Sequence, residues 1–261
     1  PPRSTLFPYT TLFRSIIYES KERVNTFECD FQRCWKLASI FQHFTEAAMT
    51  SAAQLGAGFD VMLSQNLFWV HSRMNIMFFA YPQAGDEVII RTWPKTIQQK
   101  LFYIRDFEML DNTGKPLALA TSAWLVIDAT KRRMIPPRSL NIELPSLPDK
   151  VGLDEPLEKL GLDNDGEERL CVRAGYSVVD MLGHVNNSRY IDWICDAFPI
   201  DIYKNNILDW IQINYDHEIR PGEEVALLAK ERADKDGVWQ VVGNNRSKDT
   251  LAFEALLHWK Q

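Results

Sequence analysis

Hydrophobic residues recur along the chain at two different spacings, and segments of the two kinds alternate. In residues 34–55 the apolar positions lie three or four apart, so they fall on one face of a predicted helix. These positions are Leu37, Ile40, Phe41, Phe44 and Ala48. Gly56 and Gly58 follow, and we expect them to end the helix.

Segments with the alternation typical of strands come after this helix, and the whole order then repeats. The first set covers 68–79, 86–93, 99–110 and 117–128. A second helix is predicted over 187–198, and its strands over 210–218, 224–233, 238–247 and 251–260. A short strand is expected before each helix.

Three sequence blocks recur in the same order in the two halves of the chain, which indicates an internal duplication. Residues 28–48 resemble 179–197, 81–93 resemble 219–229, and 116–124 resemble 250–258. One helix laid on an antiparallel sheet, built twice, is an α+β architecture.

The duplication predicts a first unit over 16–135 and a second over 169–261. Residues 136–168 are rich in Pro, Leu and acidic residues, so we expect a long linker outside the core.

The stretch TLFPYTTLFRS within residues 1–15 reads, codon for codon, like a common sequencing-library adapter, which indicates an artefact. A secretion signal is the alternative, but the stretch lacks a continuous apolar segment.

Composition narrows the class of protein and of partner. With 46% hydrophobic and 25% charged residues the chain is globular in composition. A net charge of −6 argues against nucleic acid as the main partner. The four cysteines show no metal-binding spacing, so we expect no metal, no cofactor and reduced thiols in a cytoplasmic protein. No apolar run approaches the roughly 18 to 20 residues of a membrane helix.

Polar residues are concentrated just before the second predicted helix, in VVDMLGHVNN (178–187). If that helix begins near His184, the N–H groups from Gly183 onward are unpaired first-turn donors at the positive end of the helix dipole. Such donors suit a developing oxyanion. Gly183 would let a carbonyl group approach the backbone closely. Asp180 has a plainer alternative role, as the N-cap of the helix.

Several stretches together resemble the bacterial acyl-acyl-carrier-protein (acyl-ACP) thioesterases. They are WVHSRM, RTWP, RDFEMLD, TSAWLVID, GHVNNSRYIDW and INYDHEI, and the resemblance spans residues 18–259. The family implies a tandem (double) hotdog fold, in which each half is a curved antiparallel sheet wrapped around one central helix. It also implies that the first hotdog, 16–135, forms the acyl-chain slot and that the second, 169–261, is catalytic.

The resemblance carries the catalytic positions onto Asp180, His184 and Glu218. Asp180 would attack the thioester carbonyl or deprotonate a water molecule, while the other two position or activate the water. The thiol leaving group has a pKa of about 8.5, so strong acid assistance is unnecessary. The expected oxyanion and substrate-binding positions are Gly183, Val185, Asn186 and Asn187.

Each assignment has a structural alternative. His184 also fits a polar residue at a helix start, and Glu218, expected inside a strand, could face solvent. Asn186 and Asn187 fit caps as well as substrate contacts. In the first half Asp30 takes the place of Asp180, but the glycine and the histidine are absent there. The first half is therefore expected to keep the fold but to lack catalytic groups, with its apolar residues lining the acyl-chain slot. The alternative is that these residues form only hydrophobic core.

Three positions depart from the family pattern. The resemblance implies a catalytic network of an Asp, an Asn, a His and a Glu, but Leu182 stands at the Asn position. Val178 stands where a second Asp often precedes the first by two residues, and Ile219 stands where plant relatives carry a cysteine. No cysteine nucleophile is therefore expected at Ile219. The departure at Leu182 weakens the assignment of the four-residue catalytic network.

The expected function is hydrolysis of acyl-ACP to free fatty acid, which ends chain elongation. The alternatives are an acyl-CoA thioesterase and a catalytically silent acyl-binding protein. A hotdog hydratase is disfavoured. A resemblance to that group would imply an Asp and a His five positions apart, whereas Asp180 and His184 are four positions apart. The expected partner is acyl carrier protein with a phosphopantetheine-linked chain, and the chain is expected to be a monomer or a homodimer.

Because the carrier protein is acidic, a basic docking patch is expected despite the negative net charge. The best candidate run contains Lys131, Arg132, Arg133 and Arg138. A solvated strand end is the alternative.

Overall fold

The computed structural model describes residues 15–140, 142–154 and 157–260. The adapter-like stretch, apart from Ser15, lies outside the described residues. The elements of the first half are β1 (Tyr18–Arg23), η1 (Thr26–Glu28), α1 (Leu37–Gln54), α2 (Phe59–Ser64), β2 (Leu67–Phe78), β3 (Glu87–Gln98), β4 (Phe102–Asp111), β5 (Pro116–Asp128), β6 (Met134–Ile135) and η2 (Pro137–Ser139). Those of the second half are β7 (Glu167–Arg173), η3 (Tyr176–Val178), α3 (Asn187–Asp196), α4 (Ile200–Asn205), β8 (Ile207–Tyr215), β9 (Glu224–Glu231), β10 (Val238–Asn245) and β11 (Thr250–Lys260).

The described strands form one antiparallel sheet with the order β1-β3-β4-β5-β2-β8-β11-β10-β9-β7, and β6 pairs with β5. The order reads the same from either end once β1 to β5 are matched with β7 to β11, so the duplication seen in the sequence is present in space. β2 and β8 join the halves, with Arg73 opposite Asn214 and Met77 opposite Trp210. The expected α+β architecture is confirmed.

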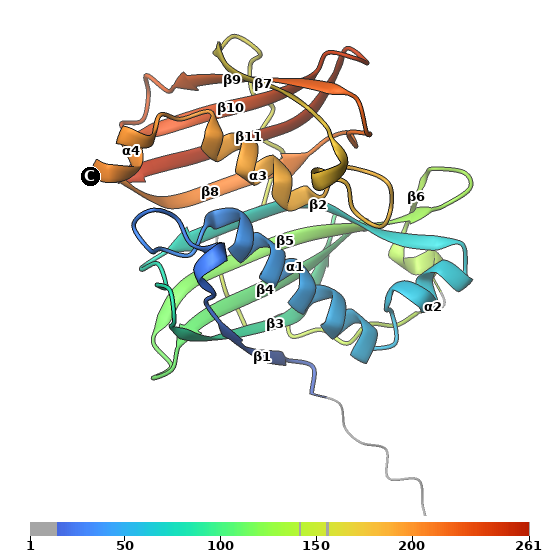
Figure 1. The fold of residues 1–261 in the computed structure, drawn as a ribbon. Helices are drawn as coiled ribbons and strands as arrows, with labels where there is room; N and C mark the ends of the chain where they lie inside the picture. The colour runs from blue at the N-terminus through green and yellow to red at the C-terminus, as the bar shows by residue number, and fades with distance from the viewer. Residues whose placement is uncertain (1–14, 141, 155–156, 261) are drawn as a thin grey trace, which may run out of the picture.

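Both central helices lie on the same face of the sheet, α1 over the first-half strands and α3 over the second-half strands (Figure 1). They contact each other, and Gln42 Nε2 of α1 donates to Ser188 Oγ of α3 at 3.0 Å. Each half is therefore a curved sheet around one helix, as the resemblance implied.

The side chains of α1 differ in size along the helix, and this difference determines where the space between the helix and the sheet is filled. Near its start, large side chains pack on the sheet, and Phe44 stacks on Phe107 of β4 with ring centroids 5.1 Å apart. One turn after Phe44 and beyond, the buried residues of α1 are small, including Ala48 and Ala52. Small side chains leave space between this end of the helix and the sheet, which becomes part of the site described below.

Several element boundaries differ from those expected. α1 begins at Leu37 rather than at residue 34, because residues 29–35 form a turn closed by a Cys29–Trp35 bridge. β3 continues past residue 93 to Gln98, with a shift of register after Pro94 that accommodates the missing N–H. α2 was not expected.

Two further corrections bear on the site. α3 begins at Asn187, which confirms the start of the predicted range 187–198, so the start near His184 on which the oxyanion argument depended is wrong. β8 ends at Tyr215, so Glu218 lies in the following loop and not inside a strand.

The linker packs against the sheet, so the expectation that it runs outside the core is wrong at Leu153 and Leu157, which are each only 5% exposed. Two buried carboxylates of the sheet hold its backbone. Asp106 accepts from Gly152 N–H at 2.8 Å, and Glu254 accepts from the N–H groups of Gly161 and Leu162.

Candidate active site

A tight turn presents Asp180 directly before α3. Gly183 N–H donates to Asp180 O at 3.0 Å, Asp180 N–H donates to His184 O at 2.9 Å, and Val179 bridges to Val185. This is a short hairpin whose last loop residue adopts a positive φ, and Gly183 has φ +80°. The glycine is therefore needed for backbone conformation.

The first half contains the same turn, with Asp30 in place of Asp180 and Arg33 at φ +68°. There the Asp30 carboxylate accepts from the N–H groups of both Gln32 and Cys34 at 2.9 Å. In the second half Asp180 Oδ1 accepts from Leu182 N–H at 2.9 Å. Within the described residues no second backbone donor reaches the Asp180 carboxylate, so it keeps more acceptor capacity than Asp30.

Asn186, and not Asp180, is the N-cap of α3. Its Oδ1 accepts from Ser188 N–H at 3.0 Å and from Ser188 Oγ at 2.7 Å. The cap alternative for Asp180 is therefore wrong, and for Asn186 the cap reading is the one observed.

The expected oxyanion donors need correction, because most of their N–H groups are already bonded. Gly183 N–H donates to Asp180 O, Val185 N–H to Ile219 O at 2.8 Å, and Asn186 N–H to Val178 O at 2.9 Å. The physical reason is the late start of α3, which leaves these residues in the hairpin and not in a first helical turn. In the part of the chain that the structure describes, the N–H groups of His184 and Asn187 have no protein acceptor.

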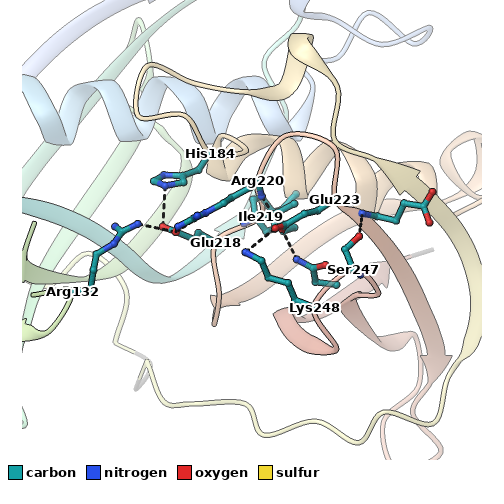
Figure 2. Close-up of polar contacts among 11 residues, drawn as sticks. Arg132, His184, Glu218, Ile219, Arg220, Glu223, Ser247 and Lys248 are labelled. Atoms are coloured by element: carbon teal, nitrogen blue, oxygen red, sulfur yellow. Dashed lines mark hydrogen bonds and ion pairs between the residues drawn. The ribbon is translucent and has the colours of Figure 1, made fainter. Parts of the chain in front are cut away.

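Glu218 is the centre of an ion-pair network (Figure 2). Its Oε2 lies 3.1 Å from His184 Nε2, and its Oε1 accepts from Arg132 Nη2 at 2.9 Å and from Arg220 Nη2 at 2.8 Å. Its side chain is 36% exposed, so Glu218 faces solvent in part and the ion-pair network in part. The carboxylate joins the β5–β6 hairpin of the first half to the α3 turn of the second.

The charges around Glu218 fix its protonation. Burial acts to raise the pKa of the Glu218 carboxyl, but the hydrogen bond from Arg220 and the charges of His184 and Arg132 outweigh burial and lower that pKa below its ordinary value. Glu218 is therefore ionised at neutral pH and can orient His184 through Nε2.

Two hydrogen bonds hold the loop after β8 against α3. Ile219 N–H donates to Tyr190 Oη at 3.2 Å, and Tyr215 Oη donates to Asn187 O at 3.2 Å. With the bond from Val185 N–H to Ile219 O, they set Glu218 below His184. Ile219 itself is fully buried.

A cavity of about 1020 Å³ opens at this network and extends under α1. Asp180, His184 and Glu218 all line it, together with Val185, Asn186 and Asn187. Gly183 is not among the described lining residues. The remaining wall comes mainly from the first half, with described residues of 137–140 and 142–146, and includes Ala48, Ala52, Met62, Trp69, Tyr103 and Trp124.

The departures from the family pattern lie at different depths. Leu182 lines the cavity mouth with 45% of its surface exposed, whereas Val178 packs against the hydrophobic core.

Of the basic run, Lys131, Arg132 and Arg133 are exposed in the β5–β6 turn, and Arg138 lines the cavity. Arg132 is paired with Glu218, a role that sequence reasoning missed. No local signal reveals this pair, because 86 residues separate its members.

Across the described residues no group of three or more His, Cys, Asp or Glu side chains is arranged to hold a metal ion. Among the described residues, no helix is both long and apolar enough to cross a membrane.

Two sequence profiles match successive parts of the chain. The Acyl-ACP thioesterase N-terminal domain matches residues 15–137, and the Acyl-ACP thioesterase C-terminal domain matches residues 162–261. The chain belongs to the acyl-ACP thioesterase family. The profile boundaries fall on either side of the linker.

Curated relatives of this family are plant enzymes. The palmitoyl-acyl carrier protein thioesterase of Gossypium hirsutum is 27% identical over 216 residues, which are 78% of this chain and 52% of the relative. The oleoyl-acyl carrier protein thioesterase of Coriandrum sativum is 25% identical over 251 residues, 87% of this chain and 66% of the relative. The chain spans about half the length of the first of these.

Solved structures show the same fold. The acyl-ACP thioesterase of Bacteroides thetaiotaomicron superposes with a TM-score of 0.86 at 22% identity, over 94% of this chain and 98% of the other. The 12:0-ACP thioesterase of Umbellularia californica gives 0.82 at 21% identity, over 95% and 98%. The tandem hotdog fold is thereby confirmed.

Proposed function

We propose that this acyl-ACP thioesterase family member hydrolyses acyl-ACP to free fatty acid and the carrier thiol. The observation that carries the proposal is the cavity of about 1020 Å³ whose mouth holds Asp180 together with the His184–Glu218 pair. An apolar slot that ends at a carboxylate and an imidazole suits a long acyl chain attached to a hydrolysable group.

In the proposed reaction, Asp180 accepts the proton of a water molecule that adds to the acyl carbon, or it adds to that carbon itself. His184, oriented by ionised Glu218, positions the water. The oxygen of the tetrahedral intermediate accepts from the free N–H groups of His184 and Asn187; of the positions first expected, only Asn187 keeps this role. The C–S bond then breaks, and the thiolate takes up the proton that Asp180 accepted from the water. If Asp180 itself adds to the carbon, cleavage leaves an acyl–Asp180 anhydride; a water molecule then hydrolyses it to the fatty acid, restores the carboxylate and supplies the proton of the thiol.

The division of labour between the halves follows from the cavity lining. We propose that 169–261 supplies the reacting groups, and that 16–135, with part of the linker at 136–168, encloses the acyl chain. The small residues Ala48 and Ala52 of α1 support this assignment, because they leave the space that the chain would fill.

The carrier protein is proposed to approach the β5–β6 turn. Lys131 and Arg133 are exposed there, next to the cavity mouth marked by the Arg132–Glu218 pair, and Arg138 lines the cavity nearby. Arg132 is less available for docking than expected, since Glu218 already accepts from it.

The test compares matched acyl-ACP and acyl-CoA substrates with the full chain, using Asp180→Ala as the inactive reference. We expect turnover of both, with a higher kcat/KM for acyl-ACP. A higher kcat/KM for acyl-CoA would make the acyl-CoA thioesterase the better assignment. Binding of acyl thioesters without turnover would make the protein a silent acyl-binding member of the family, as the departures at Leu182 and Val178 allow.

The cytoplasmic location, the absence of a cofactor and the state of monomer or homodimer stay predictions.

A further inference from the structure

Arg105 is a buried cation in the wall of an otherwise largely apolar cavity. It lies on β4, is only 7% exposed, and lines the cavity under α1. Its Nη1 donates to Ser51 Oγ at 3.0 Å and to Thr92 Oγ1 at 3.2 Å, so the guanidinium points to the helix side of the sheet. Asp106, the next residue, faces the opposite side and holds the linker.

The charge of Arg105 has no counterion. Among the described residues no carboxylate forms an ion pair with it, and both of its partners are neutral hydroxyl groups. Desolvation lowers the pKa of Arg105 to about 10, so the side chain is still protonated at neutral pH. A buried charge without a partner is unfavourable, which makes such a group unusual unless a ligand completes it.

Three N–H donors of Arg105 stay available, because Nε and Nη2 have no acceptor in the described part of the chain. A guanidinium with these positions free matches the two oxygens of a carboxylate. The space beside it exists because α1 carries Ala48 and Ala52 there, whereas Phe44 and Phe107 fill the corresponding space nearer the start of the helix.

We propose that Arg105 forms a subsite for a carboxylate at the far end of the acyl chain, so that the protein accepts ω-carboxyacyl thioesters. The inference rests on the proposed function, since it assumes that the chain enters this cavity with its thioester at Asp180. The carboxylate would receive hydrogen bonds from Nε and Nη2 of Arg105 while Ser51 and Thr92 keep Nη1 in place.

The first test needs no variant and no catalysis. Binding of α,ω-dicarboxylic acids and of monocarboxylic acids of equal length to the full chain is measured by calorimetry over a series of lengths. We expect the diacid to bind at least about tenfold more tightly at one length, the range of a single charge-assisted contact. Equal or weaker binding of the diacid at every length would overturn the proposal.

The second test uses Arg105→Gln and the matched variant Arg73→Gln. Arg73 is a partly buried arginine of β2 that bonds Leu157 O of the linker and does not line the cavity. We expect Arg105→Gln to abolish the diacid preference and Arg73→Gln to retain it, with the folding of both checked by thermal unfolding. A preference that survives in folded Arg105→Gln would contradict the subsite.

Hydrolysis separates this inference from the proposed function. If the protein binds diacids preferentially through Arg105 but cleaves no acyl-ACP, the subsite stands and the hydrolase assignment fails. If it cleaves unsubstituted acyl-ACP and shows no diacid preference, the hydrolase assignment stands and the subsite fails.

Discussion

At the scale of single residues, Glu218 depends on partners from two parts of the chain. His184 and Arg220 come from the second half, and Arg132 reaches it from the first. Such a carboxylate has little freedom to turn, so it can hold the His184 ring in one orientation. The site therefore combines Asp180, whose carboxylate accepts one backbone hydrogen bond, with Glu218, which is held by three side chains.

Replacing Glu218 by Gln is expected to lower kcat for acyl-ACP hydrolysis by about 10²-fold or more, the usual contribution of an acid–base group. The neutral amide cannot stabilise a charged His184. Glu223→Gln is the matched control, because Glu223 pairs with Lys248 on the far side of the same loop (Figure 2). Steady-state kinetics of the two variants check this, and equal losses would point to a structural effect of the loop.

The pH dependence follows from the lowered pKa of Glu218. Arg132→Gln removes one of the charges that depress this pKa, so the carboxyl is expected to take up its proton at a higher pH as the solution is acidified. The acid limb of the kcat/KM profile should then move to higher pH. Arg133→Gln, the neighbouring charge, should leave the limb where it is, and identical profiles for the two variants would contradict the assignment.

At the scale of elements, the two hairpins before α1 and α3 explain what the sequence could and could not show. The apolar spacing located both helices, and the shared Asp marked equivalent positions. The helix pattern predicted the observed start at Asn187, but the oxyanion argument assumed a start near His184, because a hairpin closed by Gly183 resembles a helix start in sequence. Both have an Asp followed by Gly and Asn, and only the long-range bond from Val185 N–H to Ile219 O distinguishes them.

Gly183 is expected to matter for stability rather than for approach of the substrate. A Cβ at Gly183 would meet no atom within 4 Å, but φ is +80°. Gly183→Ala should therefore lower the free energy of unfolding by about 1 kcal/mol, the cost of a left-handed non-Gly residue. Urea unfolding checks this, with Gly175→Ala as the control, since Gly175 has φ −96° and equally free space. A loss of activity with no loss of stability would restore the close-approach role.

The roles of Asp106, Glu254 and Arg132 could not be predicted either, because each depends on a partner far away in the sequence. Asp106 and Glu254 looked like ordinary strand residues, yet they are buried and bind the backbone of the linker. Arg132 looked like part of a docking run, yet it pairs with Glu218. In each case the partner is more than 40 residues away, as the bond from Gly152 N–H to Asp106 with its separation of 46 illustrates. Local pattern carries no signal at such distances.

At the scale of the whole molecule, one continuous sheet lets the two halves share a single cavity. β2 pairs with β8, and the turn after β5 reaches the loop after β8 through Arg132 and Glu218. Residues of both halves therefore line one cavity, as the proposed division of labour between them requires. The basic turn between β5 and β6 lies beside the cavity mouth, and it is the docking site that we propose for the carrier protein.

Reversing the charges of Lys131 and Arg133 together, by Lys131→Glu and Arg133→Glu, is expected to lower kcat/KM for acyl-ACP by about tenfold at low salt, because charged rims govern association. Short thioester analogues should be hydrolysed as before. The matched control reverses Lys235 and Lys260, two exposed lysines of the second half. If carrier-bound and short substrates lose rate equally, the docking assignment is wrong.

The central claim is that Asp180 acts in hydrolysis while the equivalent Asp30 only closes a turn. The most direct test measures acyl-ACP hydrolysis by Asp180→Asn and Asp30→Asn in parallel, since both positions share one turn geometry and differ in cavity access. The account predicts a loss of at least about 10²-fold in kcat for Asp180→Asn, with near-normal turnover for Asp30→Asn. Undiminished turnover by folded Asp180→Asn would contradict it.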